Sequence, residues 1–116
     1  MKNILVVDDD PGMRVLLFEL FDDIGYFVTK AEDGIDALEK LGEKKFDLMI
    51  TDINMPNMGG VELVSRCRSL YPNLPILAIT GFGDKVVVGK KYGDAFLKKP
   101  FELSSLFSYT EKLLNR

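Results

Sequence analysis

The chain has 116 residues, 47% of them hydrophobic and 28% charged, which is the size and composition of one folded domain with its own core. No apolar run approaches the ~20 residues of a membrane span, and acids follow the first apolar run where a signal peptide would need small residues. We therefore expect a cytoplasmic protein with no membrane contact. The net charge of −3 argues against direct nucleic-acid binding, and the absence of histidine excludes Ser-His and Cys-His catalysis and His-ligated metals.

The first two predicted elements are a strand and a helix. Residues 2–7 form a short, β-branched apolar run, which is typical of a buried strand. A stripe at three- and four-residue spacing then predicts an amphipathic helix. Asp10 can cap this helix, Pro11 suits its first turn and Gly25 suits its end. The stripe consists of Met13, Leu16, Leu17, Leu20, Phe21 and Ile24.

Four more strands are predicted, at residues 26–31, 46–51, 75–80 and 95–98. The strand at 26–31 is mixed in polarity, so we place it at a sheet edge. Stripes between and after these strands predict three further helices, the first of which Gly42 should close. Their stripe residues are Ile35, Leu38 and Leu41; Val61, Val64, Cys67 and Leu70; and Leu103, Leu106, Phe107, Thr110, Leu113 and Leu114. Cys67 is the lone cysteine, and we expect an inert, packed thiol that forms no disulfide.

The segment between Thr80 and the last predicted strand is poor in helix formers. It contains three consecutive valines and Gly89, and each costs a helix roughly 0.5–1 kcal/mol relative to alanine. Any helix there should be short or irregular, and the amides of residues 84–91 should exchange with solvent faster than those of the first and last helices. Overall, strands alternate with helical segments five times, which predicts an α/β domain with a parallel sheet between two helical layers.

Polar residues gather where the predicted strands end. Asp8, Asp9 and Asp10 follow the first strand, Asp52 follows the third, and Thr80 and Lys99 stand at the ends of the fourth and fifth. In open parallel sheets, ligands bind beyond these carboxyl ends. If the first and third strands are neighbours, at least three carboxylates converge there.

Converging carboxylates need a counter-ion, and an oxygen-only ligand set suits Mg²⁺. Asp8, Asp9 and Asp52 carry −3, which Mg²⁺ and Lys99 would balance, so the loaded site could accept a phosphoryl group on Mg²⁺, Lys99 and the Thr80 hydroxyl. Each residue alone has a simpler interpretation: Asp10 as a helix cap, Thr80 as a strand end, Lys99 as a solvated side chain and Phe96 as core. The combination favours a functional site.

The segments "VVDDD", "TDINMPNMGG", "AIT" and "FLKKPF" together resemble the receiver domain of bacterial two-component response regulators of the chemotaxis-regulator type. The resemblance covers residues 1–116 as one domain. It implies a flavodoxin-like doubly wound (βα)5 sandwich with strand order 2-1-3-4-5. It also implies a signalling protein that catalyses only its own phosphorylation and dephosphorylation.

The resemblance further implies a role for each site residue. Asp52 resembles the phosphoacceptor, and Asp8, Asp9, Asp52 and the backbone carbonyl of Asn54 resemble the Mg²⁺ site. Lys99, which precedes Pro100 in what resembles the family's cis peptide, and Thr80 resemble the phosphoryl-contacting residues. Thr80 and Phe96 resemble the switch pair.

The partners implied are a sensor histidine kinase or a histidine phosphotransfer protein, and an output domain or partner protein outside this chain. A homodimer formed on phosphorylation is a further implied state. The segment between Thr80 and residue 95 departs from the family's pattern, so the resemblance does not predict which surface of this chain carries the signal.

Three alternatives remain. A phosphohydrolase of the haloacid dehalogenase type would have Asp8 and Asp10 at its two-residue spacing and would carry the phosphoryl group on Asp8, but Pro11 and Gly12 do not fit its motif. A flavin or nucleotide binder would need a phosphate-cradling loop where the three aspartates stand. A degenerate receiver would only dock to partners.

Overall fold

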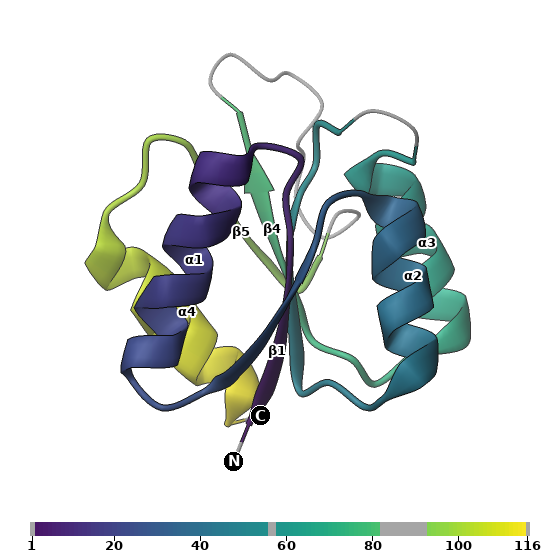
Figure 1. Cartoon of the computed structure of the whole chain (residues 1–116), viewed down its shortest axis with the longest axis horizontal. Helices are drawn as coiled ribbons and strands as arrows, with labels where there is room; N and C mark the ends of the chain where they lie inside the picture. Colours follow the sequence, from purple (N-terminus) through teal and green to yellow (C-terminus); the bar gives the residue numbers. More distant parts are fainter. Residues whose placement is uncertain (1, 56–57, 82–92, 116) are drawn as a thin grey trace.

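The computed structural model describes residues 2–55, 58–81 and 93–115 (Figure 1). Within them the chain forms a sheet flanked by helices. The strands are β1 (Asn3–Val7), β2 (Phe27–Ala31), β3 (Leu48–Asp52), β4 (Ile76–Thr80) and β5 (Ala95–Lys98). The helices are α1 (Pro11–Asp23), α2 (Gly34–Glu43), α3 (Gly60–Leu70) and α4 (Leu103–Leu114).

The strands form one parallel sheet in the order β2-β1-β3-β4-β5. The predicted fold class and strand order are therefore confirmed, and the mixed-polarity strand β2 lies at an edge as expected. β1 and β3 are neighbours, with Val7 opposite Thr51. This pairing meets the condition under which the acids at their carboxyl ends can come together.

The two faces of the sheet are covered separately. Figure 1 shows α1 and α4 on one face and α2 and α3 on the other. Alternate residues of β1 serve the two layers: Ile4 and Val6 pack toward the α1 and α4 side, and Leu5 and Val7 toward the α2 and α3 side. A strand buried on both faces must be apolar throughout, which explains the uninterrupted apolar run at residues 4–7.

Most strand boundaries agree with the prediction to within one residue, but two boundaries were wrong. β3 begins two residues later than predicted and contains Asp52 as its last residue. Helix α2 continues through Gly42 to Glu43. A Cβ added at Gly42 would meet nothing within 4 Å, so this glycine is not required by a close neighbour.

Several stripe residues are exposed rather than buried, contrary to the prediction. Most of them lie in the first or last turn of a helix or just beyond it. Leu16 is different: it stands beside the fully buried Leu17, and neighbouring helix positions point about 100° apart. The exposed residues are Leu16, Ile24, Ile35, Val61, Leu70 and Leu103. Cys67 is buried as expected, and burial raises the pKa of its thiol to about 11.

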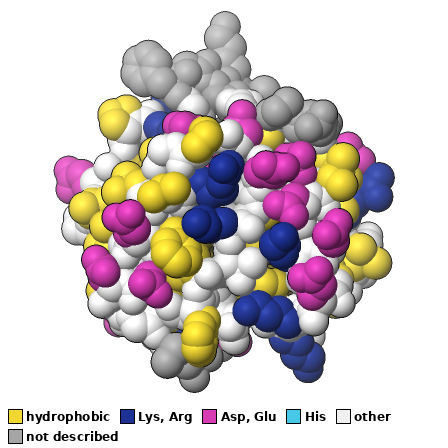
Figure 2. Space-filling view, in the orientation of Figure 1, with side chains coloured by type: hydrophobic (Ala, Val, Ile, Leu, Met, Phe, Trp, Pro, Cys, Tyr) yellow, Lys and Arg dark blue, Asp and Glu magenta, His cyan; other side chains and the backbone are white. Residues whose placement is uncertain are grey.

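The predicted irregular helix and fast amide exchange at residues 84–91 lie outside the described residues. Among the described helices, none combines the length and apolar character that a bilayer crossing needs. Figure 2 shows one face of the molecule, on which Lys and Arg side chains form a central band with Asp and Glu on both sides. The two signs of charge are therefore mixed on this face.

Candidate functional site

The site lies at the carboxyl edge of the sheet. Main-chain hydrogen bonds continue past the strand ends and hold the following residues in line. The Ile53 amide donates to the Ile79 carbonyl at 2.9 Å, and the Lys99 amide donates to the Thr80 carbonyl at 2.8 Å. After β1, the Asp8 amide likewise donates to the Ala31 carbonyl at 3.2 Å, so the residues after β1, β3 and β5 start from fixed backbone positions.

Three carboxylates from two strands meet at this edge. One oxygen each from Asp8, Asp9 and Asp52 lies within 4.8 Å of the others, and we call these residues the acidic cluster. Asp8 and Asp52 are buried, whereas Asp9 is exposed. The predicted convergence of these carboxylates is therefore present in the structure.

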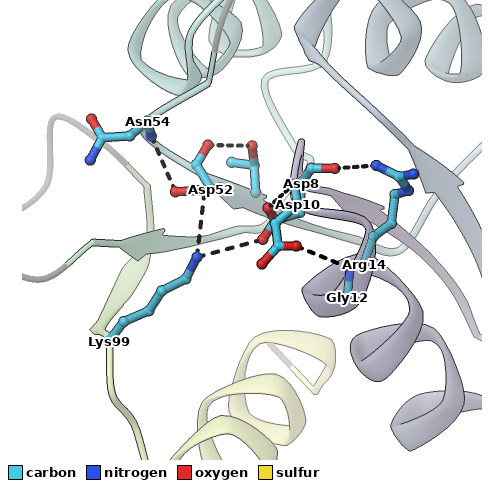
Figure 3. Close-up of polar contacts among 8 residues, drawn as sticks. Asp8, Asp10, Gly12, Arg14, Asp52, Asn54 and Lys99 are labelled. Carbon is cyan, nitrogen blue, oxygen red and sulfur yellow. Dashed lines mark hydrogen bonds and ion pairs between the residues drawn. The ribbon is translucent and has the colours of Figure 1, made fainter.

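Asp8 is the most constrained member of the acidic cluster. Its Oδ1 accepts a hydrogen bond from the Asp10 amide at 2.9 Å (Figure 3). Its Oδ2 is buried and accepts no hydrogen bond from any residue that the structure describes. Lys99 Nζ faces this oxygen at 3.7 Å. The pKa of the Asp8 carboxyl is raised to about 6, mainly by burial and also by the neighbouring Asp52 and Asp9 carboxylates, against the opposing effects of the Asp10 amide and Lys99.

Asp52 is held by its own strand and loop and by Lys99. The Asn54 amide donates to Oδ1 at 3.1 Å, and Lys99 Nζ lies 3.5 Å from Oδ2. The Thr51 hydroxyl donates to the Asp52 main-chain carbonyl at 2.9 Å. Burial raises the pKa of the Asp52 carboxyl, and the Asn54 amide and Lys99 partly offset this increase. Lys99 thus stands between the two buried carboxylates, as Figure 3 shows.

Asp10 does not belong to the acidic cluster. Its carboxylate accepts from the Gly12 amide at 3.0 Å and caps α1, the role that its position before the helix predicted. Sequence reasoning missed Arg14, whose Nη1 donates to the Asp8 carbonyl at 2.8 Å (Figure 3). Arg14 lies one helical turn after the cap, and no local pattern signals that its side chain reaches back to the strand end.

Thr80 and Phe96 lie on neighbouring strands. Thr80 is buried at the end of β4, opposite Lys98 of β5. Phe96 is 40% exposed, so its interpretation as a core residue is wrong. Side chains alternate along β5, and Leu97 faces the core while Phe96 faces outward. The Lys99–Pro100 peptide bond is cis, as the sequence resemblance implied.

The acidic cluster fits a hard divalent cation. The atoms that would bind the cation are all oxygens. Among the described residues, Asp8 Oδ2 has no hydrogen-bond partner, which is unusual for a buried carboxylate oxygen. Ligands of one Mg²⁺ at about 2.1 Å would stand about 3–4 Å apart, and the three oxygens here lie within 4.8 Å of one another.

Comparison with known proteins identifies the same architecture. The model of the response regulator receiver domain matches residues 4–111. The response regulator receiver protein CpdR of Brucella abortus is 41% identical, and the match covers 98% of both chains. The crystal structure of the response regulator TrrA of Thermotoga maritima in complex with Mg²⁺ and BeF is 34% identical, with a TM-score of 0.88 over 97% of this chain and 99% of that one. TrrA has also been crystallised in complex with the histidine kinase ThkA.

Some relatives are much longer than this chain. The transcriptional regulatory protein GlrR of Escherichia coli is 32% identical over 98% of this chain, which spans only 26% of GlrR. The chain thus matches nearly the whole of CpdR and about a quarter of GlrR.

Proposed function

The chain belongs to the response regulator receiver domain family, and we propose that it is a phosphorylatable switch whose Asp52 accepts a phosphoryl group in a Mg²⁺-dependent reaction. The observation that carries the proposal is the acidic cluster with Lys99 placed between two of its members. Burying two neighbouring carboxylates destabilises their ionised forms. Such an arrangement is typical of a functional site, here one that binds a cation and a transferred phosphoryl group.

Asp52 is the proposed nucleophile. One of its carboxylate oxygens would form a new bond to phosphorus while the bond between phosphorus and the donor's histidine nitrogen breaks. The nitrogen leaves with the bonding electron pair, and the product is an acyl phosphate on Asp52. The Asn54 amide at 3.1 Å from Oδ1 fixes the orientation of the carboxylate, which is most of what phosphoryl transfer asks of a protein.

The other site residues would neutralise charge. Asp8, Asp9, Asp52 and the Asn54 carbonyl would hold Mg²⁺, which when bound polarises the phosphoryl oxygens. Lys99 lies 3.5 Å from the Asp52 carboxylate and could turn its ammonium group onto a phosphoryl oxygen. Thr80, at the end of the adjacent strand, would offer its hydroxyl to another.

Thr80 and Phe96 would form the switch. A phosphoryl group adds about −1.5 to −2 charge at neutral pH, and this charge can draw a hydroxyl toward the site. The Phe96 ring is partly exposed in this structure, so an inward movement behind Thr80 would bury additional apolar surface. The output would be a changed surface rather than a released product.

A sensor histidine kinase or a histidine phosphotransfer protein is the proposed phosphoryl donor, acting in the cytoplasm. The complex of TrrA with the kinase ThkA supports this class of partner. Residues 1–116 would act together as one receiver domain. Its signal would pass to an output domain or partner protein, or to a second copy of the chain after phosphorylation.

The proposal is tested by intact-protein mass after incubation with acetyl phosphate, with Mg²⁺ and with EDTA. We expect a Mg²⁺-dependent phosphoryl adduct that is absent from Asp52→Asn. Asp10→Asn is the matched control, because asparagine preserves the helix cap outside the acidic cluster. No adduct on the wild-type protein despite Mg²⁺ binding would contradict the proposal and favour a docking-only receiver.

A further inference from the structure

Two glycines lie against the loop that joins β3 to α3. A Cβ on Gly60 would overlap the main chain of Asp52 and lie 2.5 Å from Ile53 Cα. A Cβ on Gly34, at the start of α2, would lie 2.8 Å from the Cβ, the Cγ and the carbonyl oxygen of Met58. Real side chains do not approach so closely, so both contacts exist only because these residues are glycines.

We infer that Gly34 is a positioning residue for the acidic cluster: its missing side chain lets Met58 sit against α2 and so holds Asn54 beside Asp52. The inference rests on the proposed function, in which the Asn54 carbonyl is a Mg²⁺ ligand. Gly34 belongs to a different element from every residue of the site, and α2 and α3 lie together on one face of the sheet (Figure 1).

The α2 side of this contact is held in place. The Asp33 carboxylate accepts from the Asp36 amide at 2.8 Å, and the Asp36 carboxylate accepts from the Glu32 amide at 3.0 Å. These bonds fix both the entry to the helix and its first turn. Gly34 is itself buried, so an added methyl group cannot turn toward solvent.

On the loop side, the contact between Met58 and a methyl group added at Gly34 can be relieved mainly by movement away from α3. Toward α3, the Gly60 amide donates to the Ile53 carbonyl at 2.9 Å, and Gly60 packs against the main chain. With Gly60 held in place, we expect a displacement of Met58 to reach Asn54, the described residue of this loop that bonds Asp52; residues 56–57 lie outside the described residues. The Asn54 amide hydrogen bond to Asp52 Oδ1, at 3.1 Å, is the link that this displacement would strain.

Gly42 supplies a matched control on the same helix. A Cβ at Gly42 meets nothing within 4 Å, so Gly42→Ala adds the same methyl group to α2 without a contact. Both substitutions remove the backbone freedom of a glycine, and only Gly34→Ala should disturb the loop.

The test is calorimetric titration of the whole chain with Mg²⁺ alone. We expect Gly34→Ala to raise the Mg²⁺ dissociation constant about tenfold. This is the lower end of the affinity loss seen when a residue that supports a metal ligand is mutated. Gly42→Ala should stay within about twofold of the wild type. Urea unfolding in EDTA, run on the same variants, separates loss of fold from loss of Mg²⁺ affinity. Equal dissociation constants for folded Gly34→Ala and Gly42→Ala would overturn the inference.

Met58→Ala keeps the inference testable if Gly34→Ala does not fold, because it removes the Met58 Cγ from the contact with Gly34 without adding atoms. It should also weaken Mg²⁺ binding, and an unchanged dissociation constant would then overturn the inference. Failure of the proposed function looks different: Mg²⁺ binding would be absent from the wild type, or unaffected by Asp9→Asn.

Discussion

Removing the charge of Asp8 should stabilise the metal-free protein. Asp8 is buried, its Oδ2 lacks a hydrogen bond from the described residues, and burial raises its pKa from 3.8 to about 6. The folded protein therefore holds a proton that the unfolded chain has lost, and the free energy of unfolding falls as the pH rises through this range. Asp8→Asn keeps an acceptor for the Asp10 amide and removes the titrating group.

The magnitude follows from the two pKa values. A difference of about two pH units, at about 1.4 kcal/mol each, gives up to about 3 kcal/mol at pH 8. At pH 4.5 the carboxyl is still protonated in the folded protein and only partly ionised in the unfolded chain, and the same linkage gives about 1 kcal/mol. The advantage of Asp8→Asn should therefore grow with pH.

Urea unfolding in EDTA at these two pH values measures the effect. At pH 8, the midpoint of Asp8→Asn should exceed that of the wild type by about 1–3 M. Asp9→Asn is the matched control, because the exposed Asp9 carboxylate keeps its contact with water and should change the midpoint much less. A less stable Asp8→Asn at pH 8, or an advantage that does not grow between the two pH values, would refute the reasoning.

Two further predictions separate structural acids from those of the acidic cluster. Asp10→Ala removes the cap bond to the Gly12 amide and should lower the free energy of unfolding, measured in urea, by about 1 kcal/mol. It should reduce Mg²⁺ affinity less than Asp9→Asn does. An equal loss of Mg²⁺ affinity would place Asp10 in the metal site. Asp94→Ala removes an acceptor for the Ile76 amide at 2.8 Å and for Arg68 at 3.0 Å, and should cost about 1–3 kcal/mol by the same assay. A loss below about 0.5 kcal/mol would show that water replaces these bonds.

The strand ends of the site were predictable because their positions follow from topology alone. Parallel strands finish at the same edge, so Asp8 and Asp52 had to meet once β1 and β3 were neighbours. The cap at Asp10 was predictable for a similar reason, since its role depends only on the residues next to it. In each case the physical cause lies in the strand order or in a few adjacent residues.

Other features depend on contacts that no local pattern contains. The outward position of Phe96 depends on which face of β5 meets the core. A shift of the strand register by one residue would have turned Phe96 inward and Leu97 outward. The Arg14 bond to the Asp8 carbonyl and the approach of Gly34 to Met58 join separate elements. Such contacts are set by how the elements pack, and the helical stripes that misassigned Ile24 and Leu70 carry no information about where the sheet ends.

The position of the phosphoryl group tests the central claim most directly. After reaction with acetyl phosphate and Mg²⁺, borohydride reduces an aspartyl phosphate to homoserine, and peptide mass spectrometry locates the changed residue. We predict homoserine at Asp52, in the peptide that continues into Asn54. Homoserine at Asp8 would contradict a receiver and indicate the chemistry of a haloacid dehalogenase-type phosphohydrolase.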